Sequence, residues 1–228
     1  MQDVITVSKS MYSLILIDDV VKAVDRLAYE RGVSRSGLIN RILAEYLSMV
    51  TPEKWVEDIF SHVAGAADGE NTLQILSQAP GGMLQVRSVL RYKYNPTIRY
   101  TIEIPPRAGV CTGSFRVLSR TQSPALLGHL QIFFQIWARI EEECLGSAGH
   151  ALPSHEIAGG RYWRELQLGQ GGGTPDSRLV GRAIGEYLQL FDKALDAFFL
   201  TENTADPQTS RRIAAMYNAF LQKGSLHL

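Results

Sequence analysis

The chain has 228 residues, of which 45% are apolar and 20% charged, an ordinary composition for a globular protein. Basic and acidic side chains number 23 each, so the overall charge argues for no particular partner. The sequence has no apolar stretch of the roughly 20 residues that cross a bilayer, no secretory signal, and no disulfide or metal-ligand spacing at its two cysteines. We therefore exclude a membrane protein and expect a cytoplasmic location.

The opening of the chain predicts one short strand and two helices. Residues 11–16 alternate between two faces of the strand. One face carries Tyr12, Leu14 and Leu16, and the other carries Met11, Ser13 and Ile15. Asp18 or Asp19 can cap the first helix, Gly32 ends it, and Ser34 caps the second.

The strand and its two helices are too small to bury their apolar residues by themselves. Units of about 40 residues usually need disulfides, metals or a partner chain. Because the sequence offers no disulfide or metal set, we expect two copies to dimerise. If their strands pair antiparallel, the face with Leu14 packs on the helices. The face with Ser13 then lies outward, on a two-stranded ribbon that fits the DNA major groove.

Residues 9–47, and most clearly the segment LAYERGVSRSGLINRILAEYL, resemble a ribbon-helix-helix DNA-binding domain of the Arc/MetJ/CopG type. The resemblance implies an obligate homodimer of prokaryotic type. Its ribbon would read the bases of double-stranded DNA while the N-terminus of the second helix binds phosphate. Carried over position by position, the base-reading residues are Lys9, Met11, Ser13 and Ile15. The phosphate-binding residues are Ser34, Arg35 and Ser36, at a helix N-terminus suited to anions.

Two features of this segment leave a second interpretation open. Met11 and Ile15 cannot hydrogen-bond to bases, although they can contact thymine methyl groups. Residues 1–50 contain six basic and six acidic side chains, so the segment attracts polyanions weakly. The alternative is a protein-assembly module in which the ribbon-helix-helix unit only dimerises the chain.

The middle of the chain predicts a further helix followed by a break. Thr51 and Pro52 begin the helix, and the small, polar segment 64–72 is a candidate hinge. The predicted parts are a ribbon-helix-helix domain at 1–50, a linking helix and hinge at 51–83, and an α+β regulatory or oligomerisation domain at 84–228.

The second informative segment is a predicted hairpin over residues 84–104, with its turn at Asn95 and Pro96. A third strand is predicted at 114–120, and the tyrosines of the hairpin are expected in the core. Residues 85–120 hold seven basic side chains and one acidic one. This basic sheet either binds phosphate, from DNA beside the ribbon or from an anionic small molecule, or is a solvated face. The candidate anion-binding residues among them are Arg87, Arg91, Lys93, Arg99, Arg116 and Arg120.

The rest of the chain completes an α+β pattern. Three more helices are predicted, beginning at Ser123–Pro124, Pro175 and Pro207. Glu141–Glu143 are expected to be solvated or paired with the basic sheet. The glycine-rich run 146–174 lacks the lysine of a phosphate-binding loop and is expected to be a flexible connector, in which RYWRELQ is a short strand or a partner contact. The predicted fold class is α+β, with a small antiparallel sheet packed with several helices.

No catalytic site is recognisable in the sequence. The five histidines lack the i, i+4 pair of a helical zinc site, and His150 and His155, with Glu156, are expected to be solvated. No nucleophile elbow or Cys-His signature is present. We predict a dimeric transcriptional regulator, in the simplest case a repressor, without enzymatic activity, cofactor or metal. Its C-terminal domain would form higher oligomers, sense an effector of unspecified chemistry, or bind a protein.

Overall fold

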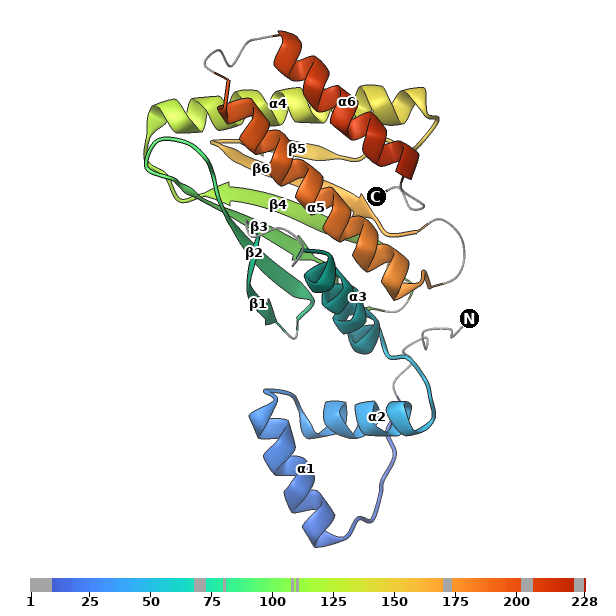
Figure 1. The fold of residues 1–228 in the computed structure, drawn as a ribbon. Coiled ribbons are helices and arrows are strands. Elements are labelled where there is room, and N and C mark those ends of the chain that lie inside the picture. The colour runs from blue at the N-terminus through green and yellow to red at the C-terminus, as the bar shows by residue number, and fades with distance from the viewer. Residues whose placement is uncertain are drawn as a thin grey trace.

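The chain is an α+β structure in which helices lie against an antiparallel sheet (Figure 1). The computed structural model describes residues 10–67, 73–79, 81–107, 109, 111–169, 174–201, 207–223 and 228. Within these ranges the helices are α1 (Asp18–Glu30), α2 (Arg35–Tyr46), α3 (Pro52–Ala67), α4 (Pro124–Ser147), α5 (Ser177–Phe199) and α6 (Pro207–Lys223). The strands are β1 (Gln74–Ala79), β2 (Met83–Val89), β3 (Thr97–Glu103), β4 (Thr112–Ser119), β5 (His155–Ala158) and β6 (Arg161–Gln167). The predicted α+β class is confirmed.

The strands form one sheet in the order β1-β2-β3-β4-β6-β5, with every neighbouring pair antiparallel. After β4 the chain runs through α4 and enters β5 at the far edge of the sheet. It then turns back through Gly159 and Gly160, both with positive φ, so that β6 lies between β4 and β5. A two-residue hairpin turn with positive φ at both positions favours glycine. The connector predicted at 146–174 is therefore wrong for residues 155–158, whereas RYWRELQ forms a strand, one of its two predicted alternatives. Residues 170–173 lie outside the described ranges.

Helices α3 to α6 pack against one face of the sheet. Along β3 the residues alternate, with Ile98, Tyr100 and Ile102 fully buried against the helices and the residues between them half-buried. The same alternation in β4 buries Phe115 and Val117, as predicted. Figure 1 shows α5 running across the strands, with α3 beside it and α6 above. One apolar core thus forms between the sheet and the helices.

The hairpin between β2 and β3 has a longer connection than the sequence predicts. The strand ends at Val89, and Tyr94 and Asn95 have positive φ in the loop that follows. Leu90 is buried, while the Tyr92 ring packs edge-on at 5.1 Å from a phenylalanine ring at the end of α5. The predicted strand over 90–94 is wrong because these residues leave the sheet to cover the helix end. The expectation that the hairpin tyrosines are core is confirmed for the buried Tyr100, holds in part for Tyr92, which packs against the core, and is wrong for the fully exposed Tyr94.

The segment predicted to link two domains contributes to the α+β core. Two glycines of α5 allow α3 to lie very close: a Cβ at Gly181 would lie 2.5 Å from the carbonyl oxygen of Ile59, and one at Gly185 would lie 2.6 Å from the Cβ of Ala66. The indole Nε1 of Trp55 donates to the carbonyl of Pro175 at 2.8 Å. Strand β1 then forms the edge of the sheet beside β2. Residues 68–72 of the predicted hinge lie outside the described ranges.

Candidate nucleic-acid interface and buried polar network

The N-terminal unit consists of two short helices joined by a tight turn. Ala28 of α1 and Leu38 of α2 are buried where the helices meet, and Gly32 in the turn has a φ of 63°. Residues 10–17, which precede α1, have no regular secondary structure in the single chain. A strand of a two-stranded ribbon obtains its hydrogen bonds from the partner strand, so a single chain neither supports nor excludes the predicted ribbon.

Apolar side chains of this unit lie open on its surface. In the predicted strand, Tyr12 is 82% exposed and Leu14 is 64% exposed. The two helices and the residues that flank them add further exposed apolar side chains: Val20, Ile42, Leu43, Leu47 and Met49. So many exposed apolar side chains on so short a unit are typical of an interaction site.

The predicted base-reading positions are open to solvent where they are described. Met11 and Ile15 are completely exposed, and Ser13 is exposed as well. Lys9 lies outside the described residues.

The predicted phosphate-binding positions lie at the first turn of α2. The hydroxyl of Ser34 accepts a hydrogen bond from the backbone N–H of Gly37 at 3.1 Å, which confirms its role as the helix cap. Ser36 is exposed. The guanidinium of Arg35 makes a two-pronged ion pair with Asp25 of α1, and this hydrogen-bonded contact raises the pKa of Arg35. Arg35 must therefore exchange a carboxylate for a phosphate to contact DNA.

One ion pair ties the N-terminal unit to the α+β unit. The guanidinium of Arg41 in α2 donates to both carboxylate oxygens of Glu57 in α3, at 2.9 and 2.6 Å. Burial opposes the charge of Arg41, but the bonds to Glu57 raise its pKa. A cavity of about 560 Å³ lies at this junction, lined by Arg31 and Val33 before α2 and by Phe60 of α3, among others. The junction is polar and incompletely filled.

The six predicted anion-binding residues do not form one face. Arg87, Arg99 and Arg116 lie on the face of the sheet opposite the helices. Their neighbours in the register include two residues that the sequence did not assign to the face, Arg161 and Trp163 of β6.

The other three basic residues lie beyond the strand ends. Arg91 lies on the helix side, where its Nε is 3.5 Å from a carboxylate oxygen of Asp196 in α5. Lys93 and Arg120 are exposed in loops. The predicted hairpin alternation placed Arg91 and Lys93 on the face in error, because the strand ends at Val89.

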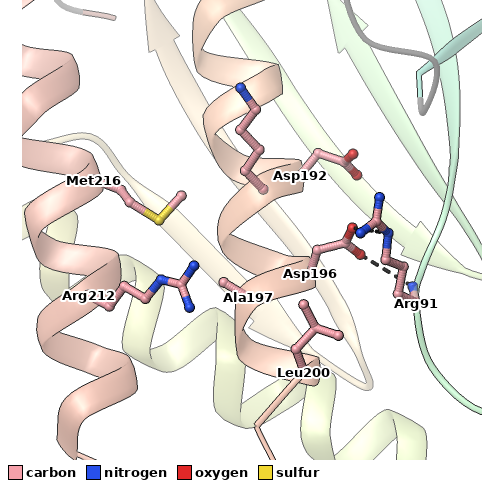
Figure 2. A pocket seen from close by; sticks show the side chains of 8 residues that line it. Arg91, Asp192, Asp196, Ala197, Leu200, Arg212 and Met216 are labelled. Atoms are coloured by element: carbon pink, nitrogen blue, oxygen red, sulfur yellow. Dashed lines mark hydrogen bonds and ion pairs between the residues drawn. The ribbon is translucent and has the colours of Figure 1, made fainter.

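A small cavity of about 300 Å³ contains Arg91 and Asp196 (Figure 2). Asp192 and Leu200 of α5 and Arg212 of α6 also line it. Charges of both signs meet here without one dominating, and the hydroxyl of the buried Tyr100 already donates to Asp192 at 2.6 Å. The described residues contain no cluster of metal-ligating side chains, here or elsewhere.

A buried polar network lies inside the core, between α4, α6 and β6. Glu141 is completely buried and pairs with Arg164, whose Nε is 3.1 Å from one carboxylate oxygen. The hydroxyls of Tyr162 and Tyr217 donate to the same carboxylate at 2.9 and 3.1 Å. The Arg164 guanidinium also lies 4.8 Å from the centre of the Tyr187 ring. Of the two predicted alternatives for Glu141, solvation is wrong; the residue pairs with an arginine of the sheet, although Arg164 is not among the basic residues that were named for it.

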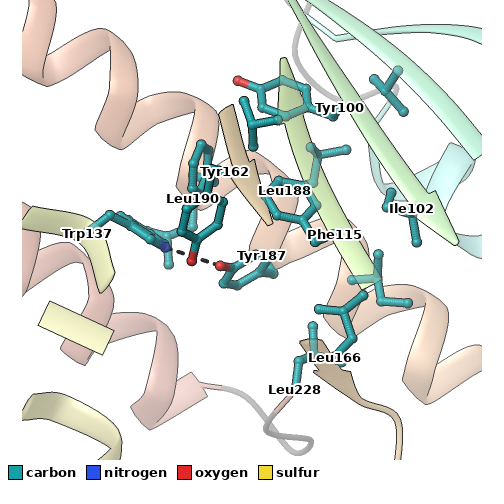
Figure 3. Packing of buried hydrophobic residues seen from close by; sticks show 14 of the residues in the cluster. Tyr100, Ile102, Phe115, Trp137, Tyr162, Leu166, Tyr187, Leu188, Leu190 and Leu228 are labelled. Carbon is teal, nitrogen blue, oxygen red and sulfur yellow. Dashed lines mark hydrogen bonds between the residues drawn. The ribbon is translucent and has the colours of Figure 1, made fainter. Parts of the chain in front are cut away.

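The network borders the aromatic part of the core, and Figure 3 shows three of the rings there, those of Trp137, Tyr162 and Tyr187. The indole Nε1 of Trp137 donates to the hydroxyl of Tyr187 at 3.1 Å. Burial raises the pKa of Tyr187, so its hydroxyl stays neutral. The network is a structural ion pair in an aromatic shell, since Glu141 and Arg164 are both fully buried.

His155 also belongs to the interior, against expectation. Its side chain is only 7% exposed, and its Nδ1 lies 2.9 Å from the hydroxyl of Tyr162. Burial lowers the pKa of His155, and its Nε2 has no partner among the described residues. The residue is a neutral core histidine.

Of the helices within the described ranges, none combines the length and apolar character needed to cross a bilayer. No protein-family model, no curated protein and no solved structure matches this chain. Its function is therefore inferred from its own residues.

Proposed function

We propose that the chain is a dimeric, sequence-specific DNA-binding protein that acts as a cytoplasmic transcriptional regulator, in the simplest case a repressor. The observation that carries the proposal is the exposed apolar surface of residues 11–49, which lies beside a capped helix N-terminus. A second copy of the same unit would cover this apolar surface and leave the N-terminus of α2 facing outward.

Dimerisation is supported by the amount of apolar surface that one chain leaves open. Full burial of a large apolar side chain contributes about 1.5–3 kcal/mol. Leu14, Leu43 and Leu47 are each about half exposed or more, and they are three of a larger set. Antiparallel pairing of residues 11–17 from two copies would bury these side chains and provide the strand hydrogen bonds that a single chain lacks.

DNA contact is supported by what the paired strands would leave outward. Met11, Ser13 and Ile15 would form the outward row, preceded by Lys9, and a ribbon of this size enters the major groove. The free N–H groups and the dipole at the start of α2 favour a phosphate. Ser34 supports this role by fixing the first turn of the helix.

The same dimer without DNA binding is the second candidate. The ion pair of Arg35 with Asp25 favours it, because the cation at the helix start is already neutralised. The apolar character of Met11 and Ile15 favours it as well.

Selection of binding sites from a random duplex pool, with the full-length protein at two salt concentrations, separates the two candidates. The proposal predicts an enriched short motif that is lost in the variant Ser13→Ala/Arg35→Ala. Arg139→Ala is the control, since Arg139 is an exposed arginine on α4 that also pairs with a carboxylate. Sedimentation must show that all three proteins remain dimers. A dimer that enriches no motif at either salt concentration supports the assembly module.

A further inference from the structure

One face of the six-stranded sheet is uncovered in the part of the chain that the structure describes. Helices α3 to α6 all pack on the opposite face, where the buried residues of β2, β3, β4 and β6 lie (Figure 1). The uncovered face carries four arginines and a half-buried tryptophan: Arg87, Arg99, Arg116, Arg161 and Trp163.

Strand register brings these side chains into two adjacent rows. Arg87 lies opposite Arg99, and Leu118 lies between Arg99 and Arg161 in the same row. With neighbouring strands about 4.8 Å apart, the three arginines span about 14 Å. In the next row Arg116 lies directly opposite Trp163.

The first row is short of negative charge. Arg99 and Arg161 form no ion pair within the described residues, whereas Arg116 pairs with Glu103 at 3.0 Å. Arg87 donates to Gln74 of β1, and its buried Nε has no partner in the described chain. Like charges directly opposite each other on neighbouring strands repel. The acidic residues of this face, Glu103 and Glu165 of the third row and Glu156 beside Trp163, lie away from the arginine row.

The chemistry of this face matches an anionic, aromatic ligand. Two copies could not meet through the arginine row, because cations would face cations. A flat sheet does not enter a duplex groove, but it can stack unpaired bases on an aromatic ring while arginines bind the phosphates. We propose that the open face binds single-stranded nucleic acid, with phosphates on Arg87, Arg99 and Arg161 and a base stacked on Trp163. This site is separate from the N-terminal DNA-binding unit proposed above and does not depend on it.

Fluorescence anisotropy with a labelled 20-nucleotide oligo-dT strand tests the arginine row in the full-length protein. The variant Arg99→Ala/Arg161→Ala should weaken binding and reduce the slope of log affinity against log salt by about 1.4, because each phosphate contact to a single strand contributes about 0.7. The control, Arg139→Ala/Arg182→Ala, removes the same charge from exposed helix positions on the other side of the molecule. Equal binding by both double variants would overturn the proposal.

Trp163 provides an independent readout. Trp55 and Trp137 are buried, so quenching of tryptophan emission by oligo-dT should come from Trp163 and disappear in Trp163→Phe. Trp163→Ala should bind oligo-dT about tenfold more weakly, and Trp163→Phe should retain most of the affinity. Circular dichroism melts verify that each variant is folded.

Two outcomes would overturn the single-strand assignment. One is tighter binding of a 20-base-pair duplex than of oligo-dT, with no effect of Trp163→Ala, because the face would then bind duplex phosphates. The other is loss of oligo-dT binding in Ser13→Ala/Arg35→Ala, because the N-terminal unit would then carry the binding. If Ser13→Ala/Arg35→Ala lost only the enrichment of a motif from the duplex pool and still bound oligo-dT, the result would bear on the proposed regulator and not on the open face.

Discussion

Replacing Arg164 with methionine tests whether the buried ion pair holds the α+β core together. The change removes the 3.1 Å contact with Glu141 and the hydrogen bond from Arg164 to the carbonyl of Glu165, also at 3.1 Å. Glu141 is 0% exposed and would keep tyrosine hydroxyls, among them those of Tyr162 and Tyr217, but would lose its guanidinium partner. Leaving one member of a buried pair without its partner costs about 3–5 kcal/mol. This is about a fifth or more of the free energy of unfolding of a typical domain, which is about 5–15 kcal/mol.

Urea unfolding followed by far-ultraviolet circular dichroism measures this loss. Arg182→Met is the matched control, because that side chain is 74% exposed and its loss should change stability by no more than about 0.5 kcal/mol. The double variant Arg164→Met/Glu141→Met should lose clearly less than the two single variants added together, since the paired charges are coupled. A loss below about 1 kcal/mol for Arg164→Met, or strict additivity in the double variant, would refute the reasoning.

Three further predictions concern packing, assembly and pH. Gly181→Ala should lower the free energy of unfolding by about 1–3 kcal/mol, because the added methyl group overpacks against α3. Gly128→Ala, at an open helical position, should raise it by up to about 1 kcal/mol. Calorimetric stability changes of the same sign for both variants would contradict the close packing of α3 and α5. Leu14→Glu should turn the dimer into a monomer in sedimentation velocity, and Tyr94→Glu, at another exposed apolar position, should leave it intact; two unchanged dimers would place the interface elsewhere. Burial lowers the pKa of His155 below 6.5, so its contribution to stability is complete above about pH 6.5 and is lost as the pH falls through the folded-state value. His155→Gln should flatten the dependence of the free energy of unfolding on pH, measured by urea titrations between pH 5 and 7.5. Equal slopes against pH for the variant and the original chain would contradict this prediction.

Local signals in the sequence predicted several of the elements correctly. Ser34 and Ser123 cap α2 and α4 as expected, because a helix start depends on a few neighbouring residues. The alternation around Phe115 and Val117 placed β4 correctly, because successive residues of one strand point to opposite faces and the buried face is therefore visible in the local sequence.

Contacts between distant segments could not be predicted from the sequence. The approach of α3 to α5 depends on Gly181 meeting Ile59, a pairing that periodicity within either helix does not contain. Arg161 joins the open face only because the chain crosses by α4 and returns through β6. The burial of Glu141 did leave a signal, since it lies four residues after Trp137 and seven after Phe134, on the apolar stripe of α4.

The two parts of the chain differ in how they are stabilised, and this difference bears on regulation. The α+β unit has a large core of its own, while α1 and α2 bury only Ala28, Leu38 and Ala44 within the single chain. Under the function proposed above, pairing with a second copy, rather than folding of the α+β unit, should therefore set the protein concentration at which the chain would bind duplex DNA. In the proposed regulator, the α+β unit would alter that binding through the junction where Arg41 of α2 pairs with Glu57 of α3. An effector or nucleic acid that bound the α+β unit would then act on DNA affinity only to the extent that it changed this contact.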